Sequence, residues 1–371
     1  MSNEQFIPKP YTTHVDEGSF TWSSPSNIAL VKYWGKREPQ IPENPSISFT
    51  LNQCKTITTL KFKKKEDQAD FSFDIFLDGT LKEDFKPKIA SFFKRIERYV
   101  PLLKKYHFTI ETKNTFPHSS GIASSASGMS ALALCLMSLE KANLKKAFDS
   151  IEVEESMTDT YFLKKASFLA RLGSGSACRS LEGPLVLWGK HSEISESSDL
   201  FGVKYPFKLH PNFENYQDTI LLIDKGEKVV SSTVGHNLMH GHPFAEARFK
   251  QASKNLSALN TILQNGDLNA FVNIVESEAL TLHAMMLTSM PYFILMKPNT
   301  LEVINKIWKY RTQHNSHVCF TLDAGANVHV LYPKSETRKV LEFIQNELVG
   351  YCENGQYICD QIGLGASEIL K

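Results

Sequence analysis

Two segments rich in small residues have the composition of anion-binding loops. The first, Pro117 to Gly128, reads Pro-His-Ser-Ser-Gly-Ile-Ala-Ser-Ser-Ala-Ser-Gly and stands between an extended segment (106–113) and an apolar helical segment (129–139). A strand, a small-residue loop and a helix N-terminus together direct free backbone N–H groups at an anion, and serine hydroxyls add donors. The loop has neither the Gly-Lys-Ser/Thr ending of a P-loop nor a dinucleotide GxGxxG pattern. We therefore expect a phosphate site here, with a serine-rich cap on a buried helix as the alternative.

The second segment, Gly173 to Ser180, reads Gly-Ser-Gly-Ser-Ala-Cys-Arg-Ser and lies between a helical and an extended segment. Small neighbours leave the Arg179 guanidinium room to bind a carboxylate or a phosphate through two hydrogen bonds. An ordinary tight turn, with the arginine paired to a surface acid, is the alternative.

Two further segments carry charged groups that could act on a substrate. In one, Lys32, Lys36 and Arg37 surround two aromatic residues, which predicts a basic anion pocket or, alternatively, solvated charges at a strand end. In the other, Asp323 precedes Ala-Gly at the end of a predicted strand, where a carboxylate is exposed enough to act and constrained enough to aim. A turn-forming aspartate before glycine is the alternative here.

Three closely spaced histidines, His236, His240 and His242, resemble part of a metal site. No acidic residue or cysteine completes a convincing ligand set around them. We therefore expect a solvated helix end at this position.

The composition restricts the class of protein. The 371 residues are 42% apolar and 22% charged, which is typical of a folded globular protein. A net charge of +1 provides no general attraction to nucleic acid or to an anionic membrane. The chain has no membrane-spanning apolar run and no apolar signal-peptide core, and its six cysteines form no CxxC pair. These features predict a cytoplasmic protein with buried free thiols.

The apolar periodicity indicates the elements that must position these groups. In the first half it predicts a turn at Asp78-Gly79, a helix over 88–103 and a helix over 154–172. The strands expected there are 20–22 and 27–33, separated by a Ser-Ser-Pro-Ser turn, then 46–51, 57–62, 71–76 and 184–188.

The second half is more helical. The expected helices are 244–263, 268–286, 300–310 and 337–348, and the expected strands are 218–223, 318–322, 327–332 and 357–362. A strand-rich half followed by helices over a small sheet predicts an α+β protein with two domains. The polar segment 193–199 favours a boundary near residue 200, which gives domains over 1–200 and 201–371.

Taken together, the four segments resemble the mevalonate diphosphate decarboxylases, within the superfamily named for galactokinase, homoserine kinase, mevalonate kinase and phosphomevalonate kinase. Two of the matching stretches, Lys32-Tyr-Trp-Gly-Lys36 and Gly173-Ser-Gly-Ser-Ala-Cys-Arg-Ser180, are highly specific for the family. The serine-rich loop alone would indicate only the superfamily. The resemblance extends from about residue 20 to 330.

The resemblance implies an N-terminal ATP- and substrate-binding domain like domain 2 of a small-subunit ribosomal protein, a ferredoxin-like C-terminal domain, and an active site in the cleft between them. It implies ATP-dependent decarboxylation of mevalonate 5-diphosphate to isopentenyl diphosphate in isoprenoid biosynthesis, with release of carbon dioxide, ADP and phosphate. The expected cofactors are ATP and Mg²⁺, the expected assembly is a homodimer, and no nucleic-acid or membrane partner is expected. No carboxylate pair has the spacing of magnesium ligands, so these ligands stay unassigned.

By the same resemblance, Asp323 faces the C3 hydroxyl of the substrate, Lys32 lies close to Asp323, and Arg179 meets the substrate carboxylate. Lys32 would keep Asp323 ionised, because an opposite charge lowers the pKa of a carboxyl group. The residues expected to bind the diphosphate are Tyr33, Lys36, Ser174, Gly175 and Ser176. The residues expected to cradle the ATP phosphates are Ser119, Ser120, Gly121, Ala123, Ser124 and Ser125.

The chain departs from the family pattern near His118 and Ser119, at His236 and at Ala326, where the family commonly has other residues. These departures affect the expected substrate preference more than the expected reaction. A decarboxylase of mevalonate 5-phosphate is one alternative. A kinase that stops after phosphorylating the 3-hydroxyl is another, but Asp323 and Arg179 together argue against it, because a simple kinase need not hold the carboxylate for departure. A non-catalytic RNA-binding module is an alternative from another class.

Overall fold

Two long antiparallel strands, β1 (Glu17–Val31) and β4 (Ser46–Lys64), form the centre of the larger of two main sheets. The computed structural model describes residues 3–11, 13–66, 70–117, 122–147, 157–226 and 232–370. The strand order is β14-β1-β4-β7-β5-β6, and β8 and β9 extend the sheet from the other end of β4. The remaining strands are β5 (Ser72–Leu77), β6 (Thr80–Leu81), β7 (Tyr106–Asn114), β8 (Leu185–Trp188), β9 (Val203–Lys204) and β14 (Ser367–Glu368).

The turn expected at residues 23–26 is wrong, because β1 runs through it. Its register with β4 continues to Pro25 opposite Lys55 and resumes at Asn27 opposite Thr50, so the chain forms a bulge instead of reversing. A bulge tolerates the missing N–H of a proline. The strands expected at 46–51 and 57–62 likewise join into β4. The Asp78-Gly79 hairpin is confirmed: both residues have positive φ, and Leu77 pairs with Thr80.

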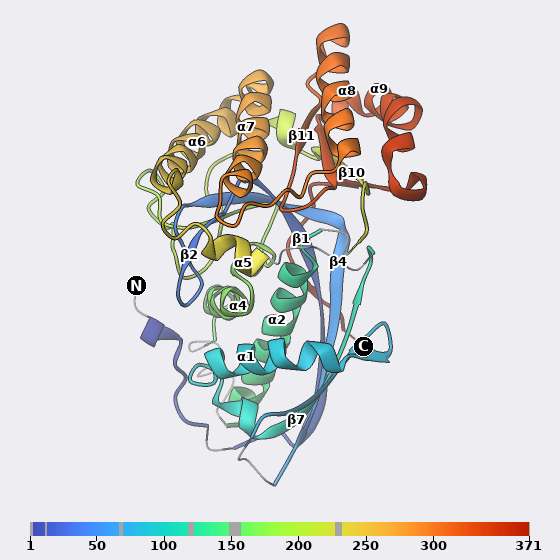
Figure 1. The fold of residues 1–371 in the computed structure, drawn as a ribbon. Helices are drawn as coiled ribbons and strands as arrows, with labels where there is room; N and C mark the ends of the chain where they lie inside the picture. The colour runs from blue at the N-terminus through green and yellow to red at the C-terminus, as the bar shows by residue number, and fades with distance from the viewer. Residues whose placement is uncertain are drawn as a thin grey trace.

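Three helices cover one face of this sheet, as Figure 1 shows: α1 (Lys86–Ile96), α2 (Ser124–Ala147) and α4 (Asp159–Gly173). Residues 129–140 of α2 are all buried, which is typical of a helix at the centre of a core. The helix expected over 88–103 ends earlier, since Pro101 begins a separate 3₁₀ turn, Pro101–Lys104.

The smaller sheet is antiparallel throughout, with the order β11-β12-β10-β13. Its strands are β10 (Gln217–Leu221), β11 (Cys319–Thr321), β12 (Val328–Tyr332) and β13 (Tyr357–Gln361). The helices around it are α5 (Ser232–Asn237), α6 (Ala245–Asn265), α7 (Leu268–Leu287), α8 (Pro298–His314) and α9 (Thr337–Phe343). The elements predicted in this half are therefore present, although α9 is shorter than expected because a π turn, Ile344–Leu348, follows it. The mixed α+β fold is confirmed.

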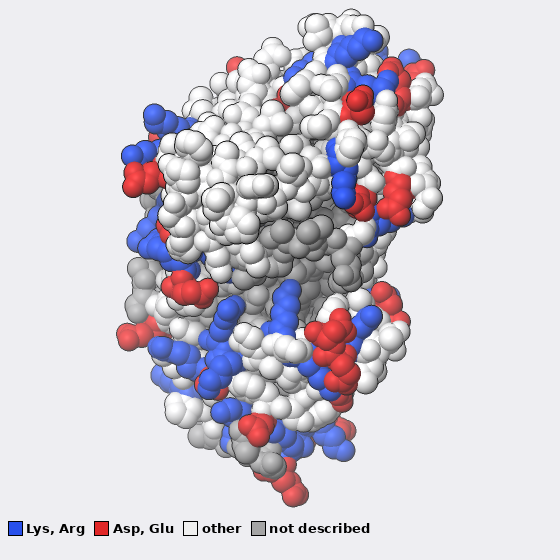
Figure 2. All heavy atoms as spheres, viewed as in Figure 1, with Lys and Arg blue, Asp and Glu red and all other residues white. Residues whose placement is uncertain are grey.

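Charges and thiols are distributed unevenly. Figure 2 shows basic and acidic side chains mixed over the lower part of the molecule, whereas the surface in front of α7 is largely free of charged side chains. In the described part of the chain, no helix is long and apolar enough to cross a bilayer. All six cysteines are unpaired; five are buried as expected, but Cys359 is exposed.

Candidate active site

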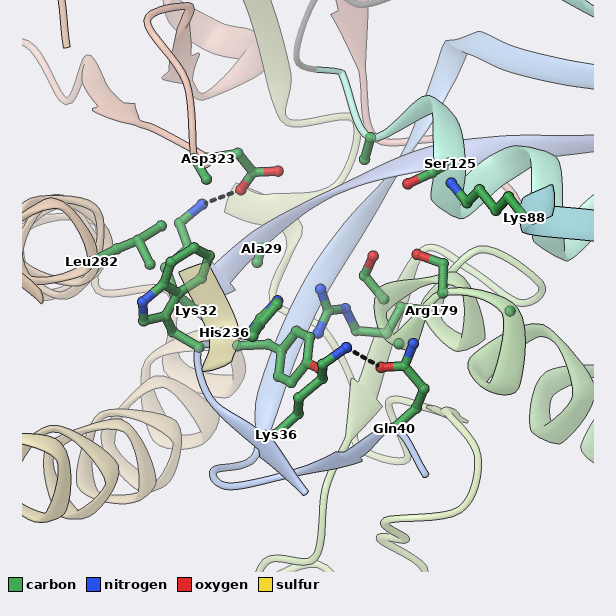
Figure 3. Close-up of a pocket in the computed structure, with 18 residues that line it drawn as sticks. Ala29, Lys32, Lys36, Gln40, Lys88, Ser125, Arg179, His236, Leu282 and Asp323 are labelled. Atoms are coloured by element: carbon green, nitrogen blue, oxygen red, sulfur yellow. Dashed lines mark hydrogen bonds and ion pairs between the residues drawn. The ribbon is translucent and has the colours of Figure 1, made fainter. Parts of the chain in front are cut away.

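A cavity of about 280 Å³ brings together the segments singled out in the sequence (Figure 3). It is lined from the end of β1, the N-terminus of α2, the 3₁₀ turn η4 (Gly175–Arg179), α5, α7 and the loop between β11 and β12. The predicted site residues that line it are Lys32, Tyr33, Lys36, Ala123, Ser125, Ser174, Gly175, Ser176, Arg179 and Asp323. Ser124 begins α2 but is not part of the lining. Ser119, Ser120 and Gly121 lie outside the described residues.

An ion pair joins the two halves of the chain in this cavity. The Lys32 Nζ lies 3.0 Å from Asp323 Oδ1, and the side chains are 1% and 30% exposed. Burial lowers the pKa of the Lys32 ammonium, and the Asp323 carboxylate opposes that shift. Lys32 follows directly after β1 and Asp323 lies in the β11–β12 loop, so the pair depends on how the two sheets meet.

The loop that carries Asp323 is held through its backbone. The carbonyl oxygen of Asp323 accepts a hydrogen bond from Gly325 N–H at 2.7 Å and lies 3.1 Å from His283 Nε2. Burial lowers the pKa of His283 to about 4, so the ring is neutral and Nε2 is the donor to this carbonyl. Thr300 Oγ1 donates to the carbonyl of Ala326 at 2.7 Å, which fixes the far end of the loop.

Arg179 is buried and oriented by neutral groups. Its Nη1 donates to Ser46 Oγ, its Nε donates to Asn27 Oδ1 at 3.4 Å, and its guanidinium lies 5.8 Å from the Trp188 ring centre. Within the described ranges, no carboxylate lies at ion-pair distance from Arg179, so the surface-acid alternative is not observed. A buried guanidinium without an acid partner is suited to an incoming anion, because an unpaired buried charge is costly.

Polar side chains of β1 connect the two small-residue loops. Ser26 Oγ donates to the Ile122 carbonyl at 2.7 Å, and Ser24 Oγ donates to the Ser180 carbonyl at 2.8 Å. Asn27 Nδ2 also donates to Ser180 Oγ at 2.8 Å. Ser24 and Ser26 were not predicted as functional residues, because the sequence pattern indicated a turn at these positions. A run of small polar residues, Ser23 to Asn27, shortly before Lys32 was the available signal.

Tyr33 and Gly175 form one wall of the cavity. The Tyr33 ring packs edge-on against Trp188 at 4.6 Å, and its hydroxyl is buried without a hydrogen-bond partner among the residues described here. A Cβ on Gly175 would lie 2.9 Å from both the Tyr33 hydroxyl and the Trp188 ring, so only glycine fits. Lys36 Nζ donates to Gln40 Oε1 at 3.0 Å. An anionic ligand in the cavity would accept hydrogen bonds from the buried Tyr33 hydroxyl and from the Lys36 and Arg179 cations.

His236 also lines the cavity, which the sequence analysis did not predict. It is 8% exposed, its Nδ1 accepts a hydrogen bond from Gly35 N–H at 3.0 Å, and its ring lies 4.2 Å from that of Tyr33. Burial, with Lys36 and Arg179 nearby, lowers its pKa to about 3. The ring is therefore neutral, and the remaining hydrogen is on Nε2.

The solvated helix end expected for the histidines is wrong for His236 and for His242, which is buried, and holds only for the exposed His240. His242 Nε2 lies 3.1 Å from the Met285 carbonyl and its Nδ1 accepts from Phe244 N–H. No group of three or more potential ligands in the described ranges could hold a metal ion.

Four more residues with functional groups or bulk were missed. Gln40, Lys88, Trp34 and Leu282 line the cavity, and Figure 3 shows Lys88 pointing toward Ser125. Lys88 was treated only as the start of a helix, although its solvent-exposed side chain also forms part of the cavity lining. A cation beside the N-terminus of α2 adds positive potential at that end of the cavity.

Comparisons with known proteins agree with this arrangement. The model of the diphosphomevalonate decarboxylase-like N-terminal domain matches residues 24–199, and that of the mevalonate 5-diphosphate decarboxylase C-terminal domain matches residues 219–364. The chain belongs to the diphosphomevalonate decarboxylase family. The resemblance read from the four segments is thereby confirmed.

Diphosphomevalonate decarboxylases from Ganoderma lucidum and Rattus norvegicus are 29% and 28% identical to this family member, over 93% and 87% of this chain and 84% and 78% of theirs. The solved mevalonate diphosphate decarboxylase of Staphylococcus aureus is 26% identical, with a TM-score of 0.78 over 95% of this chain and 98% of that one. A structure of MDDEF in complex with MVAPP, AMPPCP and magnesium is 28% identical, with a TM-score of 0.78 over 96% of this chain and 100% of that one.

Proposed function

We propose that this protein catalyses the ATP-dependent decarboxylation of mevalonate 5-diphosphate to isopentenyl diphosphate, with release of carbon dioxide, ADP and phosphate. The observation that carries the proposal is the Lys32–Asp323 pair, 3.0 Å apart, in the same cavity as the buried Arg179, which has no described carboxylate at ion-pair distance. A carboxylate positioned by an ammonium can act on a hydroxyl, and a guanidinium can bind the carboxylate that leaves. The names of the relatives support this assignment.

The substrate diphosphate lies against Tyr33, Lys36 and the segment Ser174 to Ser176, and the substrate carboxylate lies against Arg179. The Tyr33 hydroxyl and the Lys36 ammonium are donors buried in the cavity wall. A diphosphate has enough acceptor oxygens to satisfy these donors together with the hydroxyls and amides of η4. The MVAPP complex of the relative MDDEF supports a diphosphate in this family.

The chemistry follows from this placement. Asp323 orients the C3 hydroxyl and accepts its proton while the oxygen attacks the γ-phosphorus of ATP, and ADP leaves. The C3–O bond then breaks, its electron pair departs with phosphate, and positive charge develops at C3. The electrons of the bond between C2 and the carboxyl carbon form the C2–C3 double bond as carbon dioxide departs. Lys32 keeps Asp323 anionic at the start of this sequence, since an opposite charge favours the ionised form.

The ATP phosphates lie at the N-terminus of α2, beside Ala123 and Ser125, where backbone N–H groups and the helix dipole favour anions. Among the described residues, the cavity lining has one carboxylate, Asp323, and the cations Lys32, Lys36, Lys88 and Arg179. This composition fits Mg²⁺ that arrives with the triphosphate better than an all-protein magnesium cage. Among the described residues at the α2 end of the cavity, Asp323 and Ser125 carry side-chain oxygens that would be able to complete its coordination. When bound, Mg²⁺ offsets the charge of the transferring phosphoryl group.

The finer features of the fold belong to the same proposal. We infer a ferredoxin-like domain over 201–371, because its sheet order fits that pattern and helices connect β10 to β11 and β12 to β13, although several helices stand in the first connection. The N-terminal part, 1–200, would then correspond to domain 2 of a small-subunit ribosomal protein. A homodimer acting in the reducing cytoplasm stays a prediction.

Identification of the product tests the function. The enzyme is incubated with mevalonate 5-diphosphate, ATP and Mg²⁺, and the organic product is identified by mass spectrometry. Isopentenyl diphosphate formed by the wild type and not by Asp323→Asn supports the proposal. Accumulation of a stable 3-phosphorylated compound would instead identify a kinase, and absence of any product with RNA binding would identify the binding module.

A further inference from the structure

One helix contacts both partners of the Lys32–Asp323 pair. Glu278 and His283 lie five positions apart on α7 (Leu268–Leu287) and are both buried. Glu278 binds the backbone of Lys32, and His283 binds the backbone of Asp323. Neither residue is part of the cavity lining. These two side chains of α7 therefore contact the ion pair from outside the cavity lining, whereas Leu282 of the same helix faces the cavity.

The contact at Lys32 is made through a fully buried carboxylate. Glu278 Oε2 accepts the Lys32 backbone N–H at 2.8 Å. Arg248 forms two hydrogen bonds to Glu278, at 2.9 and 2.5 Å, and Asn255 Nδ2 adds a third at 2.6 Å. Both carboxylate oxygens are thus fixed by α6, which leaves Glu278 no freedom to follow a movement of Lys32.

The Lys32 carbonyl is held as well. Asn44 Nδ2 donates to it at 2.9 Å and Arg248 Nη2 donates to it at 3.3 Å. Both backbone polar groups of Lys32 therefore have partners outside β1. This residue is the first one after the strand, where the sheet no longer determines the direction of the chain.

The contact at Asp323 is a single hydrogen bond from the neutral His283 ring, 3.1 Å from Nε2 to the carbonyl oxygen. Asp323 lies in a loop between short strands, where the sheet ladder does not reach. His283 is thus the connection from α7 to the main chain of the catalytic loop.

We infer that α7 sets the distance between Lys32 and Asp323, with Glu278 and His283 as positioning residues for the reaction proposed above. Five residues of α-helix form a spacer of roughly 7.5 Å that does not stretch. Lys32 follows β1 of the larger sheet, and Asp323 lies in the β11–β12 loop of the smaller sheet. An element that contacts both residues is therefore needed to keep their side chains at a fixed distance. Misplacement of reacting groups by about 1 Å can cost ~10²-fold in rate.

The test on His283 compares two histidines with the same type of contact. His283→Leu removes the donor to Asp323, His283→Gln offers an amide N–H in its place, and His242→Leu removes a buried histidine whose Nε2 lies 3.1 Å from the Met285 carbonyl. We expect kcat to fall at least ~10-fold in His283→Leu, with KM for both substrates within roughly threefold, and to recover partly in His283→Gln. His242→Leu should lose thermal stability but keep its kcat. Equal kcat in His283→Leu and His242→Leu, or no recovery with glutamine, would contradict the inference.

The test on Glu278 uses a second buried ion pair as its control. Glu140 and Lys165, 2.7 Å apart, are as buried as Glu278 and Arg248 but lie outside the cavity lining. Glu278→Gln and Glu140→Gln both weaken a buried pair, so both should lower the melting temperature. Only Glu278→Gln should lower kcat per folded molecule, by ~10-fold or more. If both variants keep wild-type kcat, Glu278 is merely structural.

Failure of this inference can be distinguished from failure of the proposed function. A wild-type enzyme that makes no isopentenyl diphosphate would overturn the function. An active wild type whose His283 and Glu278 variants behave like their controls would overturn the inference alone.

Discussion

The Lys32 ammonium donates a hydrogen bond to the Asp323 carboxylate at 3.0 Å, although 291 positions separate the two residues in the chain. Lys32 is almost fully buried, and burial alone favours its neutral form. The carboxylate is what makes a charged lysine tolerable at this position. The two groups therefore act as one unit, and a change in either will alter the other.

Replacement of Asp323 by asparagine should remove the base and keep the shape. We expect kcat to fall by about 10²–10⁴-fold, which is the usual contribution of general base catalysis. KM for ATP and for the organic substrate should change little, because the role of the carboxylate lies in the reacting state. Steady-state kinetics measure both effects. Near-normal turnover would show that Asp323 is only a turn residue.

Replacement of Arg179 by lysine should be far from conservative. Arg179 is held by Ser46 and Asn27 and lies over Trp188, so its planar group is fixed before a ligand arrives. A lysine keeps the charge but loses the fork that binds a carboxylate. We expect a loss of roughly 1.5–3 kcal/mol in transition-state stabilisation, read from kcat/KM. An unchanged kcat/KM would place Arg179 away from the substrate.

Removal of the Tyr33 hydroxyl should weaken substrate binding without cost to the fold. The hydroxyl is buried and has no hydrogen-bond partner in the described parts of the chain, so Tyr33→Phe should keep or raise the melting temperature. We expect the wild type to prefer mevalonate 5-diphosphate over the 5-phosphate by ~30-fold or more in kcat/KM. The 5-phosphate would leave at least two hydrogen-bond donors of the site without an acceptor, and each unpaired donor costs ~1–3 kcal/mol. Tyr33→Phe should reduce this preference. Equal use of the two substrates by the wild type would overturn the diphosphate assignment and leave the decarboxylase chemistry standing.

His283 should make stability depend on pH in mildly acidic solution. Burial lowers its folded-state pKa to about 4, while the unfolded chain titrates near the ordinary value of about 6.5. Between these values the unfolded chain binds a proton that the folded chain does not. The free energy of unfolding therefore falls as the pH falls, by about 1.4 kcal/mol per pH unit for one such group. Above about pH 6.5 His283 is neutral in both states, so this loss of stability is absent.

Denaturant unfolding between pH 4.5 and 7 measures this slope. We expect His283→Gln to lose about one proton of pH dependence relative to the wild type. An identical slope in His283→Gln and wild type would mean that the folded protein accommodates a charged His283.

Local sequence patterns predicted individual helices and turns better than they predicted which segments form one continuous strand. The Asp78-Gly79 turn and the helices α6, α7 and α8 follow from short-range chemistry and from apolar periodicity, and the structure has them close to the expected bounds. The continuity of β1 could not be predicted in this way. Whether Pro25 ends a strand or forms a bulge depends on its partner in β4, which lies far along the chain.

The site could be predicted only in part for the same reason. Spacing in the sequence says nothing about the Lys32–Asp323 contact, which came from the family resemblance. His236 is buried by Gly35 and by the rings of Tyr33 and Trp34, about 200 positions away, so the sequence around it resembles an exposed helix end. Glu278 and His283 lie in the apolar pattern of a helix, where the sequence gives no sign that they face two different segments.

The ratio of carbon dioxide to ADP released during turnover tests the central claim most directly. The enzyme is supplied with mevalonate 5-diphosphate labelled in its carboxyl group, with ATP and Mg²⁺, and trapped carbon dioxide is counted against ADP and free phosphate. Asp323 and Arg179 line the same cavity, so the substrate should be phosphorylated and decarboxylated in the same turnover. We therefore expect equal amounts of carbon dioxide, ADP and phosphate. ADP released without carbon dioxide would contradict it, because Arg179 would then have no leaving carboxylate to bind.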